Sequence, residues 1–141
     1  MLEQAKVVAN RNISIFSELI SGETPLIGLE PSAILTFRDE YLRLANDQEK
    51  SKSIAAHTFL IDEFLYTEIK QGNITTDQFT RAEQTIKLHG HCHQKALSAV
   101  QNTFAALNLP KNYKVTIIPS GCCGMAGSFG YEKEHYAISM K

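Results

Sequence analysis

Two short segments contain most of the residues that could carry metal or redox chemistry. The first is His89-Gly-His91-Cys92-His93, and the second is the glycine-rich run 121–130, which begins Gly-Cys-Cys-Gly. Thiolates are soft ligands that select zinc, copper(I) or iron–sulfur clusters. Glycines on both sides of two adjacent cysteines let the backbone bend around a bulky inorganic group. The candidate ligands are therefore Cys92, Cys122 and Cys123, with Gly121 and Gly124 as the flanking backbone and His91 and His93 as further candidates.

Composition places the chain among globular domains and excludes several function classes. It has 141 residues, of which 43% are hydrophobic and 21% charged, as expected for one domain. A net charge of −1 with no basic run gives no support for nucleic-acid binding. No apolar stretch approaches the roughly 18 residues that span a bilayer, so membrane association would be indirect. Three cysteines in this spacing form no secreted disulfide framework, which predicts a cytoplasmic protein.

Hydrophobic patterning predicts the elements that would position these residues. Short β-rich or apolar runs at 26–29, 85–89 and 114–119 predict strands. Helical spacing predicts helices over 2–20, 31–44, 54–71 and 94–107 and from residue 131 onward, with a polar loop at 47–53. Strands that alternate with helices predict a layered α/β fold with a small, mainly parallel sheet and helices packed on it. In such sheets, sites gather where strands end and helices begin, which is where both cysteine segments lie.

The remaining polar residues do not suggest a catalytic centre. His57 and His135 fall within predicted helices, where a structural role is the usual one. Asp39 and Glu40 are adjacent, so their side chains point apart and fit a solvated face better than an acid/base pair. The glycine spacing matches neither the dinucleotide fingerprint nor the Walker pattern. We therefore assign no catalytic residue.

The strings HGHCHQKAL and GCCGMAGSFGYEKEHYAISMK resemble the cysteine-rich "CCG" domain. This domain occurs in heterodisulfide reductase and in the iron–sulfur subunits of glycolate oxidase and anaerobic glycerol-3-phosphate dehydrogenase. The likeness is greatest to the C-terminal iron–sulfur part of FAD-linked dehydrogenases acting on D-2-hydroxy acids such as D-lactate or D-2-hydroxyglutarate. The segment GLEPSAILTFRDEY resembles the turn that precedes those motifs, so the likeness spans about residues 25–141, with little signal between.

The resemblance implies an electron-transfer domain. A [4Fe–4S]-type cluster would be held by Cys92, Cys122 and Cys123, while FAD would bind in a domain outside this chain. The implied partners are the FAD-binding dehydrogenase domain and a ferredoxin-like domain, in the same or an associated chain. The sequence departs from the family pattern at Ala33, where a cysteine is expected, and a further expected cysteine pair would lie beyond Lys141. We therefore expect residues 1–141 to be a single domain, a fragment of a longer oxidoreductase. The isolated chain is expected to be inactive and to lack its cluster when it is made in air.

Two other site chemistries remain open from the sequence. In the first, the three cysteines and one of His89, His91 or His93 form a structural zinc site. In the second, the adjacent cysteines act as a thiol redox sensor. That option ranks last, because adjacent cysteines form a strained eight-membered ring when oxidised. A shared metal centre requires the cysteine sulfurs to lie within about 10 Å of one another, given metal–sulfur bonds of about 2.3 Å.

Overall fold

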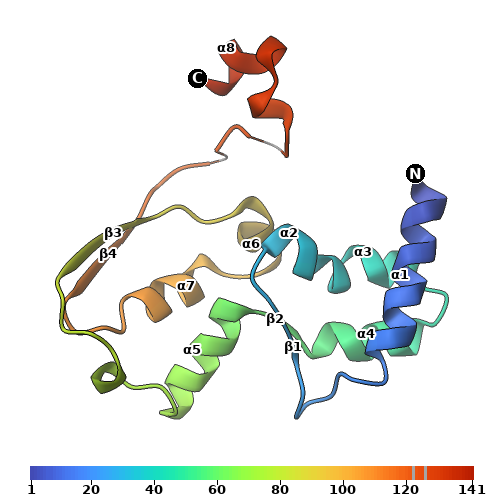
Figure 1. The fold of residues 1–141 in the computed structure, drawn as a ribbon, viewed down its shortest axis with the longest axis horizontal. Coiled ribbons are helices and arrows are strands. Elements are labelled where there is room, and N and C mark those ends of the chain that lie inside the picture. The colour runs from blue at the N-terminus through green and yellow to red at the C-terminus, as the bar shows by residue number, and fades with distance from the viewer. Residues whose placement is uncertain (122, 126) are drawn as a thin grey trace.

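The computed structural model describes residues 1–121, 123–125 and 127–141 (Figure 1). The strands are β1 (Leu26–Gly28), β2 (Thr58–Leu60), β3 (Gln84–Leu88) and β4 (Tyr113–Ile117). The helices are α1 (Leu2–Phe16), α2 (Pro31–Ile34), α3 (Glu40–Leu44), α4 (Gln48–Ala56), α5 (Ile61–Gln71), α6 (Cys92–Leu97), α7 (Val100–Leu107) and α8 (Tyr136–Ser139). Short 3₁₀ turns are η1 (Leu35–Phe37), η2 (Thr76–Gln78), η3 (Phe129–Tyr131) and η4 (Lys133–His135).

The architecture is the predicted layered α/β fold with parallel strands. β1 pairs with β2, and β3 pairs with β4 in the register Gln84 to Tyr113 through Leu88 to Ile117. Each pair is joined by a helical crossover, as parallel strands require. The described strands form two separate two-stranded sheets instead of the single small sheet that the sequence suggested. α7 packs against both β4 and α5, between the second sheet and the rest of the molecule (Figure 1).

The hydrophobic core lies in the N-terminal half of the chain. α1 contributes Ile13, while Phe37 contacts the rings of Phe16 and Tyr41 at centroid distances of 5.5 and 4.4 Å. The buried residues of this core are Ile13, Ile34, Leu35, Phe37, Ile54 and Leu60. Ile34 of α2 and Leu60 of β2 both belong to this core. The core therefore fixes the position of α2 relative to β2.

The predicted helix over 54–71 is interrupted at residues 57–60. Residues 58–60 form β2, and the predicted loop at 47–53 is instead the start of α4, where the Asp47 side chain accepts a hydrogen bond from the Lys50 amide at 3.0 Å. The strand forms because its backbone pairs with β1, a contact that helical periodicity does not report. The end of the helix is confirmed: Gly72 has a φ of +80° and terminates α5.

Two other predicted helices are interrupted. The helix over 94–107 is divided at Ser98, whose backbone is extended while its hydroxyl donates to Glu63 Oε1 at 2.5 Å. The helix over 31–44 is divided into α2, η1 and α3. The helical pattern from residue 131 becomes two 3₁₀ turns and the four-residue α8.

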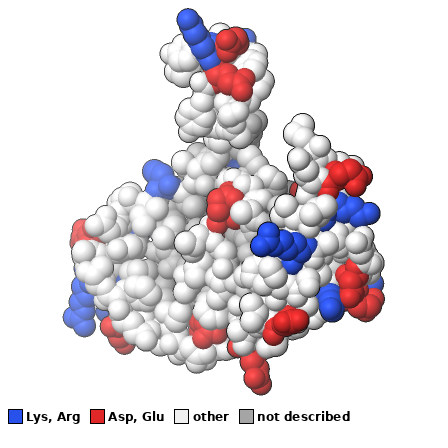
Figure 2. Space-filling model, turned by 45° about the vertical axis from the view of Figure 1, so that its right-hand side comes forward, with Lys and Arg blue, Asp and Glu red and all other residues white. Residues whose placement is uncertain are grey.

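The C-terminal part of the chain projects from the rest of the molecule (Figure 1). After β4 the chain runs outward, and η3, η4 and α8 pack on one another. In the space-filling view these residues form a knob, with Lys and Glu side chains at its outer end (Figure 2). On the body of the same face, positive and negative side chains are interspersed.

Candidate functional site

Cys92 lies at the first position of α6, four residues after the end of β3, at the strand-to-helix junction that the sequence predicted. Its side chain is exposed. His91 caps the helix, because its Nδ1 accepts a hydrogen bond from the His93 amide at 3.2 Å. The acceptor role of Nδ1 leaves Nε2 to carry the ring proton of the neutral form. The rings of His91 and His93 stack with their centroids 5.6 Å apart.

The turn that contains Ala33 packs beside the Cys92 segment. His91 Nε2 lies 3.8 Å from Glu30 Oε1, and α2 contacts α6. Glu30 caps α2 by accepting hydrogen bonds from the Ser32 amide and hydroxyl and from the Ala33 amide. The Ser32 hydroxyl makes the largest contribution to holding the pKa of Glu30 below its usual value. Glu30 was given no role from the sequence, where only Pro31 at the first helical position marks the start of the helix.

Two hydrogen-bonded contacts join the second cysteine segment to the first. The Ser120 hydroxyl lies 2.7 Å from His89 Nδ1, and Lys95 Nζ donates to the carbonyls of Ser120 and Gly121 at 2.9 and 2.8 Å. The backbone just before the adjacent cysteines is thereby held against the residues that flank Cys92. Lys95 was also missed, although it lies one helical turn after Cys92 on the same helix.

Two glycines of the run 121–130 adopt backbone conformations that glycine permits. Gly124 and Gly127 have φ angles of +81° and +71°, in the left-handed region that other residues rarely adopt. Cys123 is exposed, and Cys122 lies outside the described residues. Within residues 1–121, 123–125 and 127–141, no three His, Cys, Asp or Glu side chains form a group that could hold a metal ion.

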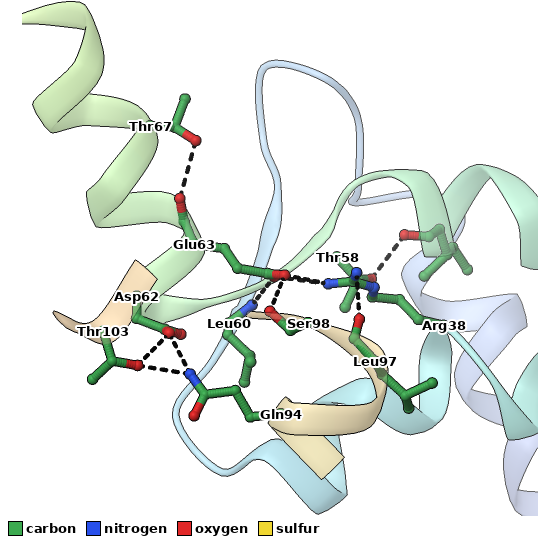
Figure 3. Close-up of polar contacts among 11 residues, drawn as sticks. Arg38, Thr58, Leu60, Asp62, Glu63, Thr67, Gln94, Leu97, Ser98 and Thr103 are labelled. Carbon is green, nitrogen blue, oxygen red and sulfur yellow. Dashed lines mark hydrogen bonds and ion pairs between the residues drawn. The ribbon is translucent and has the colours of Figure 1, made fainter. Parts of the chain in front are cut away.

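A buried polar cluster of Asp62, Gln94 and Thr103 fixes α6 (Figure 3). Asp62 of α5 accepts hydrogen bonds from Gln94 Nε2 and from the Thr103 hydroxyl, both at 2.6 Å. Gln94 also donates to the Thr103 hydroxyl oxygen at 2.7 Å. Asp62 and Gln94 are 8% and 6% exposed, so water cannot replace these bonds without a local opening. The first turn of α6, which contains Cys92, is therefore fixed to α5 and α7.

Glu63 forms a second cluster at the other end of α6 (Figure 3). Its carboxylate accepts two bonds from Arg38 Nη1 at 2.7 and 2.8 Å, one from the Ser98 hydroxyl and one from the Leu60 amide. Arg38 also donates to the Leu97 carbonyl at 3.1 Å. Burial alone would raise the pKa of Glu63, but the hydrogen bonds from Arg38, Ser98 and Leu60 outweigh it and lower the pKa below its usual value.

The residues that the sequence left without a role lie apart from this site. His57 Nδ1 is 2.9 Å from the Ser53 carbonyl at the end of α4. His135 stacks on Phe129 with centroids 3.7 Å apart, and its Nδ1 lies 2.9 Å from Glu132. Asp39 pairs with Arg43 one turn along the helix, which fits the predicted solvated face.

Gly90, between His89 and His91, is required by a close packing contact. A Cβ built at this position would lie 2.3 Å from Val100 Cγ2 and 3.2 Å from Lys95 Cε. We expect Gly90→Ala to reduce the free energy of unfolding by about 1–3 kcal/mol, because the added methyl overpacks a buried position. Urea unfolding followed by circular dichroism measures this change.

The matched control is Gly121→Ala, because a Cβ at Gly121 would have no neighbour within 4 Å. Adding Val100→Ala to Gly90→Ala removes the clashing methyl, so the double variant should be more stable than the sum of the two single changes predicts. Strict additivity would exclude this contact as the cause.

No helix among the described residues is both long and apolar enough to cross a membrane.

The chain is similar to parts of two kinds of dehydrogenase. It is 28% identical over 117 residues to D-2-hydroxyglutarate dehydrogenase of Escherichia coli K12, an alignment covering 82% of this chain and 11% of that protein. It is 25% identical over 138 residues to one subunit of the anaerobic glycerol-3-phosphate dehydrogenase of the same strain, covering 97% of this chain and 34% of that protein. D-2-hydroxyglutarate dehydrogenase of Pantoea ananatis is 24% identical over 140 residues, covering 99% of this chain and 13% of that protein.

This chain therefore spans between about a tenth and a third of the length of these relatives. No family model and no solved structure matches it.

Proposed function

We propose that the chain is an iron–sulfur electron-transfer domain of an FAD-linked oxidoreductase that acts on a 2-hydroxy acid. Cys92, Cys122 and Cys123 are its cluster ligands. The observation that carries the proposal is the connection between the two cysteine segments: both leave the carboxyl ends of the paired strands β3 and β4, and hydrogen bonds from Lys95 and between Ser120 and His89 join them. The similarity to parts of two dehydrogenases supports the association with an oxidoreductase.

The donor chemistry fits a [4Fe–4S]-type cluster, which would supply one-electron transfer when bound. Cys92 and Cys123 are exposed, and their thiolates are the soft ligands that iron–sulfur clusters require. The proposal gives Gly121 and Gly124 the role of bringing backbone N–H groups close to the ligand sulfurs. The cysteine sulfurs are expected to lie within about 10 Å of one another, the span that one small metal centre can bridge.

Substrate oxidation belongs, in this proposal, to an FAD-binding domain outside the chain, with a ferredoxin-like domain as the next electron carrier. Residues 1–141 form one domain of such an oxidoreductase and contain no catalytic residue. We place the protein in the cytoplasm, because its three cysteines form no secreted disulfide framework.

Three thiolates are one fewer than a fully cysteine-ligated cluster uses, and Ala33 is the position at which a fourth would be added. Ala33 is exposed on α2, the helix that contacts α6. We expect Ala33→Cys to increase the iron retained per chain after anaerobic reconstitution and gel filtration. Iron and acid-labile sulfide analysis measures the change.

The control is Ala82→Cys, which adds an exposed thiol before the start of β3, at the opposite end of that strand from Cys92. Equal iron retention in Ala33→Cys and the unmodified chain, with both folded, would remove Ala33 from the site.

A structural zinc site is the second candidate. The observation that favours it is the histidine arrangement, since exposed His91 and His93 flank Cys92 and stack on each other. In this alternative one histidine nitrogen and the three cysteine sulfurs would complete a four-ligand site.

The test that separates the candidates is the metal content of the chain purified without oxygen. A brown protein containing iron and acid-labile sulfide supports the cluster, whereas a colourless protein with one zinc per chain supports the alternative. A chain that binds neither, with its cysteines reduced, contradicts both.

The isolated chain is expected not to oxidise D-lactate or D-2-hydroxyglutarate with an artificial acceptor, with or without added FAD. Substrate-dependent turnover would overturn its assignment as an electron-transfer domain.

A further inference from the structure

Lys95 connects the helix that begins at Cys92 to the backbone that leads into Cys122 and Cys123. Its Nζ donates to two consecutive carbonyls, those of Ser120 and Gly121, at 2.9 and 2.8 Å. These two bonds use two of the three donors of the ammonium group. A single side chain thus bridges the two segments directly.

The path of the Lys95 side chain depends on Gly90. A Cβ at Gly90 would lie 3.2 Å from Lys95 Cε, so the absent side chain leaves room for the lysine stem. The contact between the Ser120 hydroxyl and His89 Nδ1 lies on the same stretch of backbone. Residues 120–121 are therefore held from two sides by the segment that flanks Cys92.

These bonds contribute little to global stability. The Lys95 side chain is exposed, its acceptors are neutral carbonyls, and fixing a lysine costs rotamer entropy. Their main consequence is geometric, because Gly121 directly precedes Cys122.

We propose that Lys95 is a positioning residue of the sulfur site, which clamps the carbonyls of residues 120 and 121 against the first turns of α6 and so sets the approach of Cys122 and Cys123 to Cys92. The proposal rests on the proposed function in one respect, that the three cysteines bind one metal centre. The clamp itself is a property of the chain without metal.

The test compares Lys95→Met, which keeps the stem and removes the donors, with Lys95→Arg, which restores two or more donors. The matched control is Lys87→Met on the exposed face of β3. The reduced chain is titrated with Co²⁺ without oxygen, and the sulfur-to-cobalt charge-transfer absorption reports thiolate ligation.

We expect Lys95→Met to weaken cobalt binding by about tenfold, in the range of outer-shell changes at metal sites. Lys95→Arg should recover part of the affinity, Lys87→Met should bind normally, and every melting temperature should stay within about 4 °C.

Hydrogen exchange of residues 118–121 in the metal-free chain tests the clamp separately. Faster exchange there in Lys95→Met, with the rest of the chain unchanged, supports it. Unchanged exchange, or cobalt affinity equal to that of the unmodified chain, overturns the proposal. If the unmodified chain itself gives no thiolate–cobalt absorption, the shared metal centre fails, and with it the role of Lys95 in positioning ligands, even where the exchange result shows that the contact exists.

Discussion

Replacing Cys92 with serine is expected to remove most of the iron and acid-labile sulfide from the anaerobically reconstituted chain. The serine hydroxyl is a harder ligand than a thiolate and remains protonated near neutral pH, so it does not replace the sulfur. Changes outside the ligand shell already cost about 10–100-fold in metal affinity, so the loss on removing a ligand should exceed about tenfold. The measurement is iron and sulfide per chain, together with the visible absorbance.

The fold should survive this change. Cys92 is exposed at the start of α6, and Gln94 and Ser98 hydrogen-bond to Asp62 and Glu63. Far-ultraviolet circular dichroism and a cooperative melting transition verify folding. Cys123→Ser should have the same effect on iron, whereas His57→Ala, which changes a histidine at the end of α4, should have none. Iron and sulfide at the unmodified level in a folded Cys92→Ser chain would exclude Cys92 as a ligand.

Replacing Glu63 with glutamine is expected to destabilise the protein by about 2–4 kcal/mol, because it leaves the Arg38 guanidinium without its charged partner in a largely buried setting. The Glu63 and Arg38 side chains are 14% and 28% exposed. Glutamine has one acceptor oxygen where the carboxylate accepts four hydrogen bonds, and its amide hydrogens would face the guanidinium donors. Urea unfolding at pH 7 measures the difference.

Glu49→Gln is the matched control for this change. Glu49 pairs with Lys52 at 3.2 Å, but its side chain is 89% exposed. Pairs of that kind contribute about 0–1 kcal/mol, so the control should remain close to the unmodified chain. Equal effects of the two substitutions would mean that the Glu63 cluster does not fix α6.

The destabilisation caused by Glu63→Gln should become smaller as the pH falls. Folding lowers the pKa of Glu63 below its usual 4.5, so the carboxylate contributes its full stabilisation above that pH. The contribution is lost as the pH falls through the lowered pKa of the folded state. The stability difference between the unmodified chain and Glu63→Gln should therefore be constant from about pH 5 to 7 and decrease below about pH 4.5. A difference that increases on acidification would contradict this origin.

The amino-acid sequence by itself determined the local features of the site. The adjacent cysteines between glycines, and Cys92 at a strand-to-helix junction, follow from residue type and short-range order. The strands at Leu26–Gly28, Gln84–Leu88 and Tyr113–Ile117 were predicted because apolar and β-branched residues occur there in short runs. Gly72 likewise ends α5 through its own backbone freedom.

Only the tertiary structure decided how these features are held together. Thr58–Leu60 became a strand because β1 lies beside it, although its sequence continues a helical pattern. The contacts between Arg38 and Glu63, Asp62 and Gln94, and Lys95 and Gly121 join residues 25, 32 and 26 positions apart. Periodicity and propensity describe interactions within a few residues, and contacts at such separations form only once the tertiary fold has brought η1, α5 and α6 together. For this reason the candidate ligands could be predicted from the sequence, whereas the contacts that hold their segments in place could not.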